Sequence, residues 1–327
     1  MSNINRIVWI DTVKGIAIIL IILEHTTCID SKYIGIVFTQ ITLPAFFALS
    51  GYFFKSSTSF KSFILSKISS LIIPTLFFFW GACLIYWMMQ KLGVKFVIPF
   101  NWIYALDIFN PSEKIYCNGV VWFLIALFWV NCMFYLLNKN LSLKYQLFIV
   151  FFCGLGGVLM PILNINLPYF FDSSLTALPF FMMGYLLRFY SYYIDKYKIY
   201  ITLLSLLWLA FFSTKNSMRS NTFDAPLFYH ITSLFGITTI VIFCRYINNI
   251  PVISNIYGRY SLIVLCTHPL LINPIRRFSI VYLNGNEIFT FLLVTTLEII
   301  IAPVVAKLFP YFTAQKKIIV TTSSCRL

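Results

Sequence analysis

Long apolar runs follow one another along the whole chain, and they constrain its fold more than any other feature. Most of them have the length of a membrane-crossing helix, which needs about 20 residues to span a hydrocarbon core of about 30 Å. Since 60% of the 327 residues are hydrophobic and only 10% are charged, the chain lacks the polar surface that a soluble domain needs. We therefore expect an integral membrane protein.

Helices, rather than strands of a barrel, are expected to cross the membrane. Backbone polar groups in lipid must be satisfied within the structure, and the apolar runs alternate too weakly for barrel strands. The sequence predicts an all-α fold, a polytopic transmembrane helical bundle of about ten spans, with residues 1–327 forming a single domain. The expected spans are residues 7–27, 36–54, 67–90, 118–138, 146–163, 173–190, 198–213, 226–247, 258–273 and 288–311.

The distribution of Lys and Arg sets the expected orientation. If the N-terminus is cytoplasmic, most of the 24 basic residues fall in the inside segments, whereas most acidic residues outside the spans fall in the outside loops. Cytoplasmic segments of membrane proteins carry this excess of positive charge, so both termini are expected in the cytoplasm. The net charge of +14 then reflects topology and contact with lipid headgroups, and no nucleic-acid partner is expected.

The first span carries several ionisable side chains at membrane depth, where such groups are costly and are candidates for function. Lys14 and His25 are 11 residues apart, so they leave a helix on nearly the same face, separated by roughly 16 Å along its axis. Asp11 lies within one turn of Lys14 on that face. The structural alternatives are an ion pair of Asp11 with Lys14 at the helix end and an interfacial hydrogen bond of His25.

Glu24 leaves the same helix in another direction. It is adjacent to His25 in the sequence, which places it about 100° away around the helix. We therefore expect its partner to be a basic or polar group on a different helix. Glu298, in the last predicted span, has no partner that the sequence identifies.

Five segments of the chain carry a resemblance to a known family. The stretch IDTVKGIAIILIILEHTT, residues 10–27, resembles the first helix of acyltransferase family 3, whose signature there is a basic residue, ten intervening positions and a His. Lys14 and His25 match that signature, with Lys where many members have Arg. Four later segments resemble the family in the same order: LPAFFALSGYFFKSS (43–57), NGVVWFLIALF (118–128), LPFFMMGYLLR (178–188) and YGRYSLIVLCTHPLL (257–271).

The resemblance implies a membrane-bound O-acyltransferase of the bacterial cytoplasmic (inner) membrane. Such proteins take an acyl group, usually acetyl, from acyl-coenzyme A on the cytoplasmic side and deliver it to a sugar hydroxyl at or beyond the outer face. The expected partners are acetyl-CoA as acyl donor, a polysaccharide or lipid-linked glycan as acceptor, and membrane lipid. No metal is expected, because no His cluster stands near the cysteines at ligand spacing.

The predicted catalytic residues are His25, Glu24 and His268. His25 is a general base for the acceptor hydroxyl or a transient acyl carrier, since imidazole titrates near working pH. The sequence leaves these two roles open. His268 is the second histidine candidate, with a structural hydrogen bond as the alternative, and Pro269 is expected to open the helix beside it.

The predicted coenzyme-binding residues are Lys14, Asp11 and Arg259. Lys14 lies near the expected cytoplasmic mouth, where it can act as a point charge for phosphate. Arg259 lies at the start of the ninth span, on the same side, and its alternative role is a positive-inside anchor.

A transporter is the alternative function. A secondary transporter or flippase of a glycan or small solute would also need about ten apolar spans, and Lys14, Glu24, His25 and Glu298 would then form a proton relay. Matching broken helices in two halves, typical of inverted-repeat transporters, are not evident in the sequence. The acceptor hydroxyl, the length of the acyl group and the oligomeric state are left open.

Overall fold

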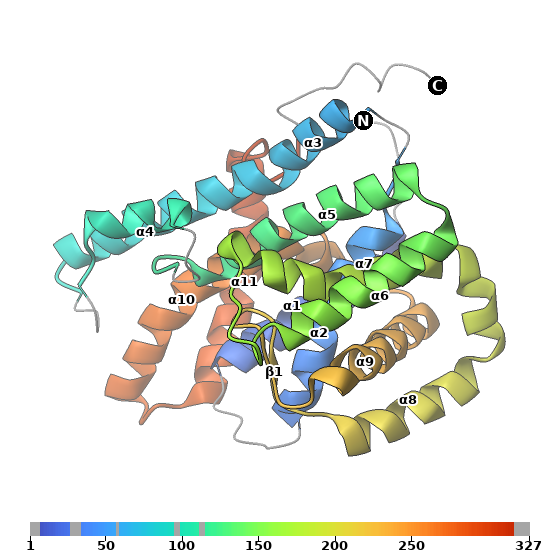
Figure 1. Ribbon diagram of the computed structural model, residues 1–327. Helices are drawn as coiled ribbons and strands as arrows, with labels where there is room; N and C mark the ends of the chain where they lie inside the picture. Colours follow the sequence, from blue (N-terminus) through green and yellow to red (C-terminus); the bar gives the residue numbers. More distant parts are fainter. Residues whose placement is uncertain (1–6, 27–33, 57–58, 95–98, 111–114, 317–327) are drawn as a thin grey trace.

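The protein is a bundle of helices with one small hairpin. The computed structural model describes residues 7–26, 34–56, 59–94, 99–110 and 115–316, and Figure 1 shows these helices packed side by side. The two strands of the hairpin pair antiparallel, with Asn216 opposite Phe223 and Ser217 opposite Thr222. The all-α prediction is confirmed.

The helices and strands have the following bounds. The first part of the chain contains α1 (Val8–Thr26), α2 (Ile34–Tyr52), α3 (Phe60–Lys67), the π-helix η1 (Ile68–Ile72), α4 (Ile73–Lys91), and the 3-10 helices η2 (Trp102–Phe109) and η3 (Gly119–Val121). The middle contains α5 (Trp122–Asn140), α6 (Leu143–Leu159), the 3-10 helix η4 (Pro168–Phe170), α7 (Phe171–Lys196) and α8 (Lys198–Phe212). The last part contains β1 (Asn216–Ser217), β2 (Thr222–Phe223), α9 (Pro226–Ile247), the π-helix η5 (Ile253–Gly258), α10 (Ser261–Tyr282) and α11 (Glu287–Leu308).

Every predicted span overlaps a helix of the structure. Within the described part of the chain, five helical stretches are long and apolar enough to cross a membrane: Phe60–Lys91, Gly119–Asn140, Pro168–Lys196, Pro226–Ile247 and Glu287–Leu308. These helices indicate a membrane protein. The count of ten spans and the cytoplasmic location of both termini stay predictions.

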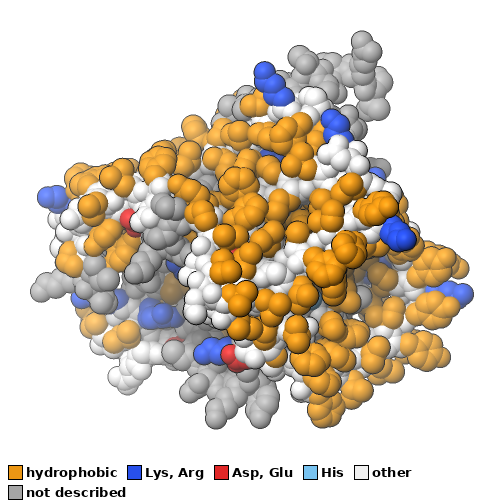
Figure 2. Space-filling model, viewed as in Figure 1, with side chains coloured by type: hydrophobic (Ala, Val, Ile, Leu, Met, Phe, Trp, Pro, Cys, Tyr) orange, Lys and Arg blue, Asp and Glu red, His pale blue; other side chains and the backbone are white. Residues whose placement is uncertain are grey.

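The outer surface of the bundle is apolar. Figure 2 shows hydrophobic side chains over most of one face, with the charged side chains sparse among them. Large side chains such as Phe151 on α6 and Leu203 and Phe211 on α8 are more than half exposed. In water such a surface would be unstable, whereas lipid tails solvate it well.

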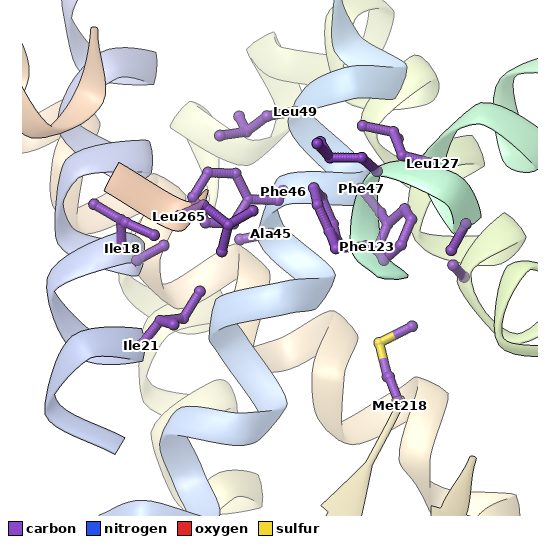
Figure 3. Packing of buried hydrophobic residues seen from close by; sticks show 14 of the residues in the cluster. Ile18, Ile21, Ala45, Phe46, Phe47, Leu49, Phe123, Leu127, Met218 and Leu265 are labelled. Carbon is purple, nitrogen blue, oxygen red and sulfur yellow. The ribbon is translucent and has the colours of Figure 1, made fainter. Parts of the chain in front are cut away.

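The core lies where α1 and α2 meet their neighbours near the centre of the bundle. In Figure 3, Ile18 and Ile21 of α1 lie on one side of α2, and Phe123 and Leu127 of α5 lie on the other. Leu265 of α10 belongs to the same buried cluster. Because α1 lies inside this packing, its polar side chains are held in fixed surroundings.

Glycines allow the backbones of α2 and α7 to come into direct contact where the two helices cross. A Cβ on Gly51 of α2 would lie 1.9 Å from the carbonyl oxygen of Phe181, and one on Gly184 of α7 would lie 1.6 Å from that of Ala48. Real atoms do not approach so closely, so α2 and α7 pack this tightly only with glycine at both positions. Small residues serve this purpose widely in membrane helices.

Substituting Gly184 therefore tests the packing. Gly184→Ala is expected to lower the unfolding temperature of the detergent-solubilised protein, because separating α2 from α7 costs about 1–3 kcal/mol in a well-packed core. The matched control is Gly156→Ala on α6, where an added Cβ meets nothing within 4 Å. Equal unfolding temperatures for the two variants would contradict the close crossing.

The helix around His268 is longer than predicted. Pro269 was expected to open it, and the span was expected to end near residue 273, but α10 continues through Pro269 and Pro274 to Tyr282. Proline is tolerated in membrane helices when neighbouring groups satisfy the freed carbonyls. The extension carries Arg276 toward the end of α1, where its guanidinium donates a hydrogen bond to the carbonyl of His25.

Candidate functional site

Two histidines from opposite ends of the sequence lie next to each other. His25 is in the last turn of α1 and His268 is near the middle of α10. Their ring centroids are 5.4 Å apart and the rings are tilted by 30°. His25 is exposed, whereas His268 has no exposed surface. The pair therefore has an accessible member and a buried one behind it.

The hydrogen bonding of His268 fixes its tautomer. Its Nδ1 lies 2.9 Å from the carbonyl oxygen of Val264, and a carbonyl only accepts, so Nδ1 carries the proton in the neutral ring. Nε2 is then a free base, and it is buried without a hydrogen-bond partner among the described residues. Pro269 contributes to this arrangement, because its missing N–H frees the carbonyl of Leu265, which also lies beside the His268 ring.

Glu24 points away from the pair, toward α2. Its side chain lies beside Thr42, the kind of polar group on another helix that the sequence led us to expect. Within the described structure, neither Glu24 Oε1 nor Thr42 Oγ1 completes a hydrogen bond. Glu24 is therefore adjacent to His25 in the sequence, but its carboxyl group does not contact the imidazole and does not orient it.

Lys14 and Asp11 form an ion pair further along α1. Lys14 Nζ lies 3.8 Å from Asp11 Oδ1, and it also lies 5.4 Å from the centroid of the Phe53 ring, just after α2. The Lys14 side chain is 27% exposed, so the ammonium group is held in place but still accessible.

The segment before α10 packs against this end of α1. A Cβ on Gly258 would lie 1.9 Å from the carbonyl oxygen of Asp11, and one on Gly15 would lie 2.3 Å from that of Ile253. Arg259, the next residue, is exposed, and its guanidinium carbon lies 5.4 Å from the centroid of the Tyr260 ring. The three predicted coenzyme-binding residues are thus gathered at one end of α1, and the two histidines at the other.

Glu298 has a partner that sequence analysis did not identify. The Thr267 hydroxyl donates a hydrogen bond to Glu298 Oε1 at 2.8 Å, linking α11 to the residue before His268. Glu298 is fully buried, and its Oε2 has no hydrogen-bond partner in the described part of the chain.

Three further polar residues lie near the histidines and were missed by sequence reasoning. Arg276 contacts the backbone of His25. Arg219 follows the first strand of the hairpin, and its guanidinium lies over Gly119. Asn118 Nδ2 donates to the carbonyl of Cys266 at 3.0 Å. The resemblance had placed Asn118 at the start of the NGVVWFLIALF segment, but nothing in the sequence connected the two arginines to His25.

The described part of the chain holds no cluster of metal ligands at this site. Among the residues that the structure describes, no three His, Cys, Asp or Glu side chains are close enough together to hold an ion. An apolar cavity of about 500 Å³ lies between α6, α7, α8 and α9, lined by residues such as Val150, Met182 and Phe235. None of the candidate residues lines it.

The fold and the site define an all-α protein with apolar helices and a histidine pair next to the end of α1. Comparison with known families matches residues 7–306, nearly the whole chain, to the acyltransferase domain of acyltransferase family 3. The chain belongs to this family, which makes it an acyltransferase. No match was found among curated proteins or among solved structures.

Proposed function

We propose that this protein transfers an acyl group, with acetyl as the first candidate, from acyl-coenzyme A to a hydroxyl of a cell-surface or lipid-linked polysaccharide. The protein then lies in the bacterial inner membrane, with the donor on the cytoplasmic side and the acceptor at the outer side. The observation that carries it is the pairing of exposed His25 with buried His268. Family membership alone gives the acyltransferase class.

In the proposed reaction His25 acts as general base. Its imidazole accepts the proton of the acceptor hydroxyl while the oxygen forms a bond to the thioester carbonyl carbon. The carbon–sulfur bond then breaks, and the coenzyme leaves as a thiol after taking up a proton. His268 acts through His25: its ring is buried beside that of His25, its Nε2 is unprotonated, and the Val264 carbonyl holds it in one tautomer.

The other end of α1 is proposed to hold the coenzyme. Lys14, steadied by Asp11, offers a positive charge to phosphate, and exposed Arg259 adds a second one nearby. Lys14 and His25 are separated by roughly 16 Å along the helix, so the phosphates and the thioester of one extended coenzyme molecule would lie at the two ends. The proposed mechanism requires this arrangement, in which the phosphates bind near Lys14 and the acyl transfer takes place near His25.

Lys14→Ala is expected to raise the KM for acetyl-CoA about tenfold, since losing one charged contact of about 1.4 kcal/mol changes affinity by that factor. The turnover number is expected to change less, and Lys14→Arg is expected to restore binding. The control is Lys61→Ala, which removes an exposed lysine of α3. A Lys14→Ala enzyme with an unchanged KM would remove Lys14 from the coenzyme site.

The proposed function can be tested with membrane vesicles. Vesicles from a strain lacking the gene, complemented with the intact protein or with His25→Ala, are supplied with radiolabelled acetyl-CoA. Alkali-labile label in the glycan fraction of the intact sample alone is the expected result. Label that enters no glycan would refute the proposal, and label that enters it equally with His25→Ala would remove His25 from the mechanism.

A further inference from the structure

Arg276 brings a positive charge to the mouth of the histidine pair. It lies two turns beyond His268 on α10, and its Nη2 donates a hydrogen bond to the carbonyl oxygen of His25. Among the described residues, no carboxylate forms an ion pair with Arg276. The guanidinium group of Arg276 therefore has further N–H donors that can bind a ligand beside His25.

Arg219 brings a second guanidinium to the same region. Its side chain is exposed and covers Gly119 so closely that a Cβ there would lie 2.6 Å from Nη2 and 2.7 Å from Nη1. Gly119 follows Asn118, whose amide is bonded to Cys266 of α10. Arg219 thus lies over the segment that packs against the helix of His268.

The position of Arg219 is built into the fold. The residue before it, Met218, is buried, and its carbonyl accepts a hydrogen bond from Ser173 Oγ at 2.8 Å. Asn221, two residues later, donates to the carbonyl of Gly157 at 3.0 Å. Figure 3 shows Met218 pointing from the hairpin into the packed interior. A hairpin anchored on both sides of Arg219 holds its guanidinium at the site.

The two cations converge on His25 from different elements. Both are close enough for their charges to act on the imidazole of His25, although one comes from the hairpin and the other from α10. When His25 takes up a proton, a third positive charge forms near these two, and like charges repel. An anion held between the guanidinium groups would offset that repulsion at the moment of proton transfer.

We propose that the acceptor is an acidic glycan, and that a carboxylate or phosphate near the acylated hydroxyl binds to Arg219 and Arg276 beside His25. The inference rests on the proposed function and names its acceptor class. Guanidinium groups form paired, charge-assisted hydrogen bonds with both kinds of anion. The bound anion fixes the neighbouring hydroxyl against His25 and balances the charge that develops there.

The test uses purified protein in vesicles, labelled acetyl-CoA, and the host's own surface glycan isolated from a strain lacking the gene. One portion of glycan is left intact, one has its carboxylates reduced to alcohols, and one is dephosphorylated. Intact glycan is expected to be acylated, and one of the two treatments is expected to raise the acceptor KM at least tenfold, which identifies the anion. Equal acylation of all three portions would overturn the inference while leaving the acyltransferase function in place.

Variants provide the second readout. Arg276→Gln is expected to raise the KM for the intact glycan about tenfold while the KM for acetyl-CoA stays unchanged, and Arg219→Gln is expected to do the same. The matched control is Arg277→Gln, which removes the exposed neighbouring arginine of α10. An unchanged acceptor KM in both site variants would overturn the inference. Absence of acylation by the intact protein on every portion would refute the proposed function, and the inference with it.

Discussion

His25→Ala is expected to lower the rate of acyl transfer by about 10²- to 10⁴-fold, the usual contribution of a positioned general base. The substitution removes the accessible imidazole of the pair. It leaves the packing of α1 intact, because the buried positions of the helix, such as Ile18 and Ile22, are untouched. The amount of protein in the membrane should therefore stay the same. The measurement is the initial rate with labelled acetyl-CoA and host glycan.

The third histidine of the described chain is the control for that experiment. His230 is on α9, and its Nε2 lies 2.9 Å from the carbonyl oxygen of Thr176 on α7. His230→Gln can preserve this hydrogen bond, so its rate per folded molecule should equal that of the intact protein. If both substitutions had the same effect, His25 would have no special role.

His268→Asn is expected to lower kcat about 10²-fold, near the lower end of acid–base contributions. An asparagine amide can keep the hydrogen bond to the Val264 carbonyl, but it has no basic nitrogen in place of Nε2. The variant thus separates the structural role of His268 from its role behind His25. A positioning role predicts a lower kcat, an unchanged KM for acetyl-CoA and an altered pH–rate profile.

A structural role for His268 makes a different prediction. If the residue only closes a hydrogen bond within α10, His268→Asn should retain nearly full activity with the same pH dependence. That outcome would remove His268 from the mechanism and leave His25 to act without it.

The positions of the helices were predictable from the sequence, because apolar runs of membrane length leave few alternatives to a helix. The end of α10 was not. Proline at 269 and 274 would end a helix in water, but membrane helices tolerate proline where other groups can satisfy the freed carbonyls, and α10 continues to Tyr282. The predicted end of α10 was wrong because a rule for proline in water-exposed helices was applied to a helix inside a bundle.

Only part of the site was predictable from the sequence. The spacing of Lys14 and His25 and the family resemblance pointed to α1 and to His268. Periodicity says which residues share a face, but it does not say which helices meet. Arg219 is in a polar loop where a cation is ordinary, and only the packing of the hairpin against Gly119 shows that it lies at the site.

The most direct test of the central claim is the ester content of the surface glycan in living cells. Three strains are compared at equal protein levels: one without the gene, one with the intact gene, and one with His25→Ala. We expect alkali-labile acyl groups on the glycan only with the intact protein. If the intact protein adds no ester but changes how much glycan reaches the surface, and His25→Ala reverses that change, the protein acts as a transporter and His25 is not the base of an acyl transfer.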